Sequence, residues 1–343
     1  MEKDLSKDQM AKIRNFEKGF ISTHLINMGA KLGIFDALNE ARDGMTIPNL
    51  ALKLGLHEPY VKVWCQTAYH FEILDCDDNG RFKFQPSLDE ILGNKSHVKN
   101  YLGNIALTVD LLGKFFEEYP DYFREGKTLG NPYTAEVSKA VSETTKNIYL
   151  AFFFIIFPKN DYLTKMLERG IKFLDIGCGG GTLIIQLAQA FKNSTFVGVD
   201  PDPYGIEEAE NMISKLKLEK QVSVKNIGGG DLPYNNEFDM ASMVVTLHEI
   251  YPDIRMKVVE KAYQALKNGG KLLILDFPYP SRIEDFRNPT HDHAIIEQFF
   301  EMCSGFIHIS LSEQNEMLTK VGFKDIQRMP VGKGMFELIT AVK

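Results

Sequence analysis

Two residues in the second half of this 343-residue chain have the types and spacing that could catalyse proton transfer. His248 follows an apolar run with the pattern of a strand, and Asp276 ends the next such run. An imidazole that titrates near neutrality can remove a proton from a hydroxyl group. His248 therefore predicts a general base at the carboxyl edge of a sheet, and Asp276 is expected at the end of the neighbouring strand.

A glycine-rich turn lies upstream of this pair. The apolar run 173–176 leads into Gly177, Gly179 and Gly181, and a second apolar run ends at Asp200. Glycine permits the positive φ angles of a tight strand-to-helix turn and lets a ligand approach the main chain. Asp200 is placed to accept hydrogen bonds from ribose hydroxyls, so the pattern predicts an adenosine-binding βαβ unit.

The charge of the turn indicates which adenosine compound binds. Thr182 stands where a dinucleotide fingerprint has its third glycine, and Asp175 places a carboxylate beside the turn. A carboxylate repels a pyrophosphate and attracts a cation. S-adenosylmethionine carries a sulfonium and an ammonium group but no phosphate, so the acidic turn favours this cofactor.

The segment 173–181 resembles motif I of the class I S-adenosylmethionine-dependent methyltransferases. Asp200 matches the acidic residue that contacts the ribose in that family. The resemblance implies that Asp231, together with its neighbour Leu232, contacts the adenine. It also implies an enzyme whose partner is a small-molecule methyl acceptor.

The residues around His248 resemble the small-molecule O-methyltransferases within this class. The resemblance implies that His248 is the general base, that Asp276 orients it, and that a hydroxyl oxygen is methylated. His308 stands where that type has a second acidic helper. This departure leaves the acceptor atom open, with sulfur and nitrogen as alternatives to oxygen.

A sheet must bring these residues to one edge. Strands are expected near 171–176, 195–199, 221–226, 238–245, 271–277, 324–329 and 335–342. Helices are expected near 182–192, 204–217, 253–267 and 311–321. The alternation predicts an α/β fold, a Rossmann-like seven-stranded methyltransferase sheet, in a domain at 169–343.

The N-terminal part is expected to be mainly helical. Apolar residues at helical spacing run from about 9 to 38, and a short helix after Thr46, a second helix near 58–71 and a hairpin follow. This order predicts a winged-helix domain at 1–100, whose extra helices favour a homodimer. The family resemblance implies that residues 101–168 are a helical linker and a lid over the acceptor pocket.

A winged helix can also bind DNA, so a ligand-sensing transcriptional regulator is the alternative to an enzyme. The expected recognition helix offers only Lys62 and begins at Glu58, whereas phosphate contacts need several basic residues. The net charge of -7 also disfavours nucleic acid and anionic membranes as partners.

Composition bounds the remaining classes. Hydrophobic residues make up 44% and charged residues 25%, as in ordinary soluble proteins. The four cysteines lack metal-site spacing, and His291 and His293 alone do not define one, so no metal is expected. The polar N-terminus and an apolar run too short to span a bilayer, at 148–158, predict a cytoplasmic protein.

Overall fold

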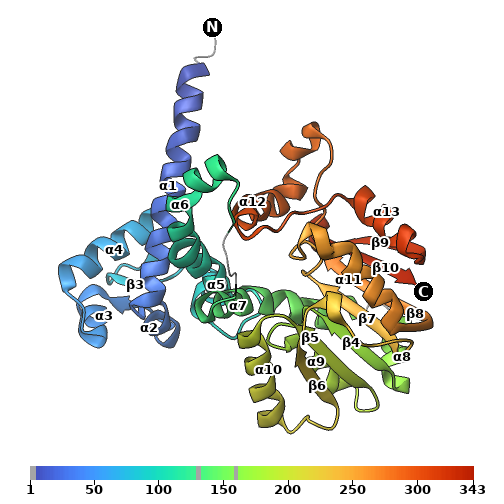
Figure 1. The fold of residues 1–343 in the computed structure, drawn as a ribbon. Coiled ribbons are helices and arrows are strands. Elements are labelled where there is room, and N and C mark those ends of the chain that lie inside the picture. The colour runs from blue at the N-terminus through green and yellow to red at the C-terminus, as the bar shows by residue number, and fades with distance from the viewer. Residues whose placement is uncertain (1–4, 129–132, 158–160) are drawn as a thin grey trace. The chain divides into compact units, whose positions relative to one another are not determined.

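The computed structural model describes residues 5–128, 133–157 and 161–343 of the chain. The chain divides into two compact units, one at Met1–Phe115 and the other at Phe116–Lys343. The ribbon in Figure 1 shows the first unit in blue to cyan and most of the second in green to red.

The first unit begins with two helices that separate at a glycine. Gly33 adopts a φ of 73° between α1 (Leu5–Lys31) and α2 (Ile34–Glu40). The unit continues with β1 (Met45–Thr46), α3 (Ile47–Leu54), α4 (Glu58–His70), β2 (Leu74–Cys76) and β3 (Arg81–Phe84), and its strands have the order β1-β3-β2. Phe35 and Trp64 pack edge to face in its core, with ring centroids 5.7 Å apart.

Helix α1 exposes apolar side chains along its first half. Ile13, Phe16 and Phe20 are 60%, 63% and 64% exposed. Single exposed apolar residues are common, but three on successive turns of one helix form a continuous apolar surface.

The second unit begins with helices that lead to the sheet. They are the end of α6 (Gly113–Glu125), α7 (Ala135–Ala151) and α8 (Asp161–Arg169). The short helix α5 (Leu102–Ala106) and the start of α6 belong to the first unit.

A seven-stranded sheet has the order β6-β5-β4-β7-β8-β10-β9, as the α/β prediction required. Its strands are β4 (Lys172–Ile176), β5 (Thr195–Asp200), β6 (Val222–Asn226), β7 (Phe238–Val244), β8 (Leu266–Asp276), β9 (Lys324–Val331) and β10 (Phe336–Val342). Strand β10 runs antiparallel to both of its neighbours, and the pairs from β6 to β8 are parallel. Only β8 departs clearly from its expected bounds. It begins at Leu266 rather than near residue 271, and its pairing with β7 shifts register between these two positions.

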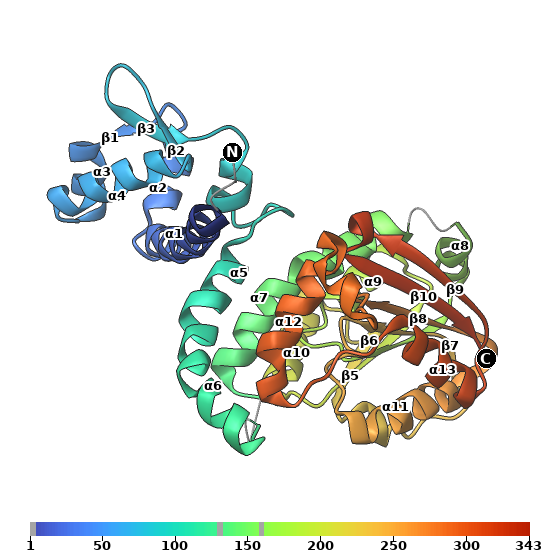
Figure 2. The same cartoon turned by 90° about the horizontal axis from the view of Figure 1, so that it is seen from above.

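Helices cover both faces of this sheet (Figure 2). The predicted helices appear as α9 (Thr182–Ala190), α10 (Pro203–Leu216), α11 (Pro252–Ala265) and α13 (Leu311–Val321). The sequence did not predict α12 (Asp292–Glu301). Among the described residues, no helix combines the length and apolar character that a membrane crossing needs.

The central strands follow directly from their sequence. Phe173 and Leu174 are fully buried in different clusters, one on each face of the sheet, because successive strand residues point to opposite sides. Burying each such side chain stabilises the fold by about 1.5–3 kcal/mol. The core therefore holds β4, and the turn that follows it, in a fixed position.

Candidate active site

The turn after β4 has the backbone that its glycines predicted. Gly177, Gly179 and Gly181 adopt φ angles of 78°, 47° and 73°. A Cβ atom at Gly177 would lie 2.3 Å from the side chain of Thr246, so no other residue fits there. Nothing lies within 4 Å of a Cβ atom placed at Gly179. The turn thus packs against the end of β7 at one glycine and leaves open space at the next.

Two carboxylates lie beside this turn. Asp200 Oδ2 accepts a hydrogen bond from the amide of Gly179 at 2.8 Å, and Oδ1 accepts one from the amide of Asp202 at 2.8 Å. Asp175 Oδ1 accepts a hydrogen bond from Ser242 Oγ at 2.6 Å, whereas the buried Oδ2 has no hydrogen-bond partner among the described residues. Burial raises the pKa of Asp175 to about 7 and that of Asp200 to about 6.

The two residues expected near the adenine are placed differently from each other. The Asp231 side chain is 76% exposed and pairs with Lys257 at 3.1 Å. Leu232 is buried in the core cluster that includes β7 and α11. Neither contact involves the glycine turn, so the adenine contacts of Asp231 and Leu232 stay a prediction.

The structure brings His248 and Asp276 into contact at the ends of adjacent parallel strands. His248 Nδ1 lies 2.5 Å from Asp276 Oδ1, and the amide of His248 donates to Oδ2 at 3.1 Å. Both side chains are buried. Val245, three residues before His248, has a φ of 49°, an unfavourable value for a β-branched residue. This strained position turns the chain at the end of β7, ahead of the histidine.

A second carboxylate faces the other side of the His248 ring. Glu301 Oε2, from the last turn of α12, lies 3.7 Å from His248 Nε2 and 3.1 Å from His308 Nε2. The two imidazole rings are 4.5 Å apart. The structure therefore packs the ring of His308 on that of His248, with Glu301 facing the Nε2 atom of each, and a catalytic role for His308 stays a prediction.

The sequence reasoning missed Glu301 and Glu297, which lies one turn earlier in α12. The signal was present in the spacing of His293, Glu297 and Glu301, because residues four apart lie on one side of a helix. It could be used only if this segment had been predicted as a helix.

Charges within this group shift one another's pKa values. Burial alone would lower the pKa of His248, but the charges of Asp276 and Glu301 raise it well above the ordinary value. Burial likewise works against ionisation of Glu301, but His248 and His308 lower its pKa to about 2. Burial and the charge of Glu301 raise the pKa of Glu297 well above its ordinary value. The group thus stabilises the imidazolium form of His248, the form that proton uptake creates, so His248 must release this proton before it can act as a base.

Arg255 is a further residue that the sequence did not single out. It is buried in α11 and donates hydrogen bonds to the carbonyl oxygens of His248 at 3.1 Å, Ile250 at 2.7 Å and Ile307 at 2.6 Å. These bonds hold the segment after β7 against the segment that carries His308. Arg255 therefore positions both histidines through the main chain.

The other two histidines considered from the sequence lie nearby. His291 Nδ1 is 2.7 Å from the carbonyl oxygen of Pro278. The ring of His293 packs on Phe277 at 4.8 Å, and its Nε2 lies 3.6 Å from Glu297 Oε2. His293 thus approaches the acidic side of α12, whereas His291 binds the main chain.

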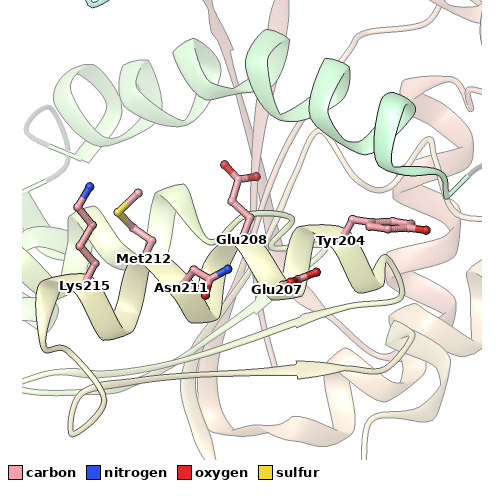
Figure 3. A pocket seen from close by; sticks show the side chains of 6 residues that line it. All are labelled: Tyr204, Glu207, Glu208, Asn211, Met212 and Lys215. Carbon is pink, nitrogen blue, oxygen red and sulfur yellow. The ribbon is translucent and has the colours of Figure 1, made fainter.

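An open hollow lies elsewhere, on one face of α10 (Figure 3). Six side chains of this helix line it: Tyr204, Glu207, Glu208, Asn211, Met212 and Lys215. None of them was predicted as a site residue. Glu208 accepts a hydrogen bond from Ser142 of α7 at 3.0 Å, and we assign no catalytic role to this hollow.

Comparison with known proteins identifies a methyltransferase domain in the second unit. Residues 174–272 match the family model described as "Methyltransferase domain". The chain is 29% identical to an uncharacterized methyltransferase of Synechocystis over 51% of this chain and 77% of that protein. It is 27% identical to the 27-O-demethylrifamycin SV methyltransferase of Amycolatopsis mediterranei, over 63% of this chain and 75% of that protein.

Solved structures share the fold along nearly the whole chain. A putative O-methyltransferase from Nostoc punctiforme superposes with a TM-score of 0.79 at 18% identity, covering 97% of this chain and 98% of that one. Human N-acetylserotonin methyltransferase, solved with S-adenosylmethionine, has a TM-score of 0.79 at 15% identity, covering 100% and 99%. With the glycine turn, the sheet order and the matched residues, the chain contains an S-adenosylmethionine-dependent methyltransferase domain with the class I fold.

Proposed function

We propose that this enzyme methylates a hydroxyl oxygen of a small molecule and that His248 is the general base. The observation that carries the proposal is the buried contact between His248 and Asp276, at 2.5 Å, on the strands next to the glycine turn. The names of the rifamycin methyltransferase and of the Nostoc structure support oxygen as the acceptor atom.

The residues at the glycine turn fit the cofactor. S-adenosylmethionine supplies a methyl group on a positively charged sulfur. The buried Oδ2 of Asp175 has no hydrogen-bond partner among the described residues, and Asp200 adds a second buried carboxylate. Both would attract a cation, and the open space at Gly179 leaves the main chain accessible. We assign ribose binding to Asp200, and adenine contacts to Asp231 and Leu232.

The acceptor is activated by removal of its proton. A hydroxyl is a poor nucleophile until that proton leaves, and a histidine within reach can take it through Nε2. Asp276 holds Nδ1, which fixes the ring orientation and stabilises the imidazolium form that proton transfer creates. His308 packs against the same ring and completes the acceptor side of the site.

Transfer of a labelled methyl group tests the proposed reaction. The purified enzyme is incubated with S-adenosylmethionine carrying a deuterated methyl group and a panel of small phenols, alcohols, thiols and amines. We expect labelled methyl ethers, detected by mass spectrometry. Labelled thioethers or methylamines without any ether would overturn oxygen as the acceptor and leave methyl transfer intact.

We do not propose DNA binding for the N-terminal unit. Helix α4 exposes Tyr60 and Val63, and Lys62 is its one lysine or arginine. A DNA-binding surface would need several basic side chains. Retention on duplex DNA that weakens steeply with salt would contradict this choice.

We propose instead that α1 forms a homodimer interface in a cytoplasmic enzyme, whose cysteines are all free. The exposed Phe16 and Phe20 are suited to pack against a second copy. Replacing both by glutamate should convert a sedimenting dimer into a monomer, whereas the exposed control Lys12→Glu should not. A wild-type chain that sediments as a monomer at micromolar concentration would contradict the dimer.

A further inference from the structure

Four potential metal-binding side chains converge on the acceptor side of the site. They come from the end of β7, from α12 and from the segment before α13, and one ligand atom of each lies within 4.8 Å of the others: His248, Glu297, Glu301 and His308. Of these, the proposed reaction uses His248 as the base. It gives no task to the two carboxylates.

The spacing of these atoms fits a metal ion. Bonds of about 2.0–2.2 Å in a tetrahedral site separate neighbouring ligand atoms by roughly 3.4 Å. Glu301 Oε2 lies 3.1 Å from His308 Nε2 and 3.7 Å from His248 Nε2. A ligand atom of Glu297 lies within 4.8 Å of those of both Glu301 and His308, so the three side chains converge on one small space.

Glu301 faces His248 and His308, whereas Glu297, in the described part of the chain, pairs only with His293, at 3.6 Å. Glu297 Oε2 is buried without a hydrogen bond, and the Glu297 side chain is only 18% exposed. Among the described residues, neither Glu297 nor Glu301 forms an ion pair with lysine or arginine. The buried Arg255 donates to main-chain carbonyl groups. Two neighbouring buried carboxylates are costly to ionise together unless a cation lies between them.

We propose that Glu297, Glu301 and His308 bind a first-row divalent metal ion beside His248. Mixed imidazole and carboxylate ligands suit ions such as Zn²⁺, Fe²⁺ or Co²⁺ better than Mg²⁺ or Ca²⁺, which prefer oxygen. Three protein ligands leave a position open for a further ligand. The site departs from the sequence-based expectation of no metal, which weighed His291 and His293 without the glutamates.

The ion would also define the acceptor, a step that rests on the proposed function. An open position on the ion binds a phenol or enol oxygen and lowers the pKa of its hydroxyl group. The O–H bond then breaks, and its proton passes to His248 Nε2. The oxygen forms a bond to the methyl carbon as the sulfonium–methyl bond breaks, leaving a neutral thioether. The substrate class is therefore a small molecule whose methylated oxygen can bind a metal.

Cobalt binding tests the site without any acceptor. The full chain is stripped with a chelator and titrated with Co²⁺, whose visible absorption reports imidazole and carboxylate coordination. We expect one Co²⁺ per chain, and at least about tenfold weaker binding in Glu297→Gln and in Glu301→Gln. The exposed Glu316→Gln in α13 is the matched control and should bind as the wild type does. No stoichiometric binding by the wild type, or equal affinity in all four proteins, would overturn the metal site.

Cofactor binding shows whether the variants are folded. S-adenosylhomocysteine affinity by calorimetry should be unchanged in both glutamine variants, and a variant that loses it is replaced by His308→Gln. Loss of Co²⁺ binding with retained cofactor binding supports the metal site. Methyl transfer to hydroxyl acceptors at the full rate after metal removal would overturn the role of the ion while the proposed function stands. Stoichiometric Co²⁺ binding with no transfer to any hydroxyl would overturn the proposed function alone.

Discussion

The glycine-turn side and the histidine side of the site are built in different ways. The first consists of Asp175, the turn at 177–181 and Asp200, which lie on one βαβ unit. The second takes His248 and Asp276 from two strand ends and its remaining groups from α12 and the segment before α13. A local segment therefore determines the first, whereas the second forms only when distant parts of the chain have packed.

This difference suggests a division of tasks. The glycine-turn side supplies main-chain groups and carboxylates for a cationic cofactor. Its two carboxylates, Asp175 and Asp200, lie on separate strands beside the turn. The histidine side concentrates imidazoles and carboxylates within a few ångströms. We expect changes on the first side to affect cofactor binding and changes on the second to affect the chemical step.

The largest effect should come from His248→Ala. If this residue removes the acceptor proton, kcat should fall by about 10²- to 10⁴-fold, the usual range for general-base catalysis. The affinity for S-adenosylhomocysteine, measured by calorimetry, should stay near the wild-type value because the loss falls on the chemical step. A fall in cofactor affinity as large as the fall in kcat would remove the distinction between the two sides.

Asp276→Asn should have a smaller effect in the same direction. Asparagine keeps the shape of the side chain and can still hydrogen-bond the imidazole, but it lacks the charge that stabilises imidazolium. Steady-state kinetics should therefore place its kcat between those of wild type and His248→Ala. The exposed control Asp253→Asn in α11 should match wild type. A kcat below that of His248→Ala would show that Asp276 does more than position the ring.

On the glycine-turn side, Asp200→Ala should weaken cofactor binding by about 1–3 kcal/mol, because it removes charge-assisted hydrogen bonds. Calorimetric titration with S-adenosylmethionine measures this change. At saturating cofactor, kcat should change less than the affinity does. Unchanged affinity would refute the ribose assignment.

The sequence predicted the two sides unequally. The positive φ angles at Gly177 and Gly181 follow from residue type, and His248 and Asp276 could be paired because strand ends meet at one edge of the sheet. Glu297 and Glu301 could not be found, because their spacing carries information only on a helix and α12 was not predicted. The contact of Arg255 with two carbonyl-bearing segments depends on packing that no local pattern encodes.

The smallest expected effect is a pH dependence of cofactor affinity. Burial holds the pKa of Asp175 at about 7 and that of Asp200 at about 6 in the free enzyme. A cationic cofactor binds better to the ionised carboxyls, so the affinity for S-adenosylmethionine should rise as pH increases from about 5.5 to 7.5. Calorimetry across this range should show the rise, and Asp175→Asn should reduce it. An affinity that falls with pH would contradict this electrostatic role.

Base catalysis by His248 is tested most directly with a matched pair of acceptors. The best hydroxyl acceptor from the panel is compared with its thiol analogue in the wild type and in His248→Ala, at saturating cofactor and near pH 8. A thiol already ionises appreciably at this pH and needs little help from a base. The account predicts that the variant loses transfer to oxygen by about 10²-fold or more and keeps most of its transfer to sulfur. Equal losses on both acceptors, or a variant that still methylates the hydroxyl at the wild-type rate, would contradict it.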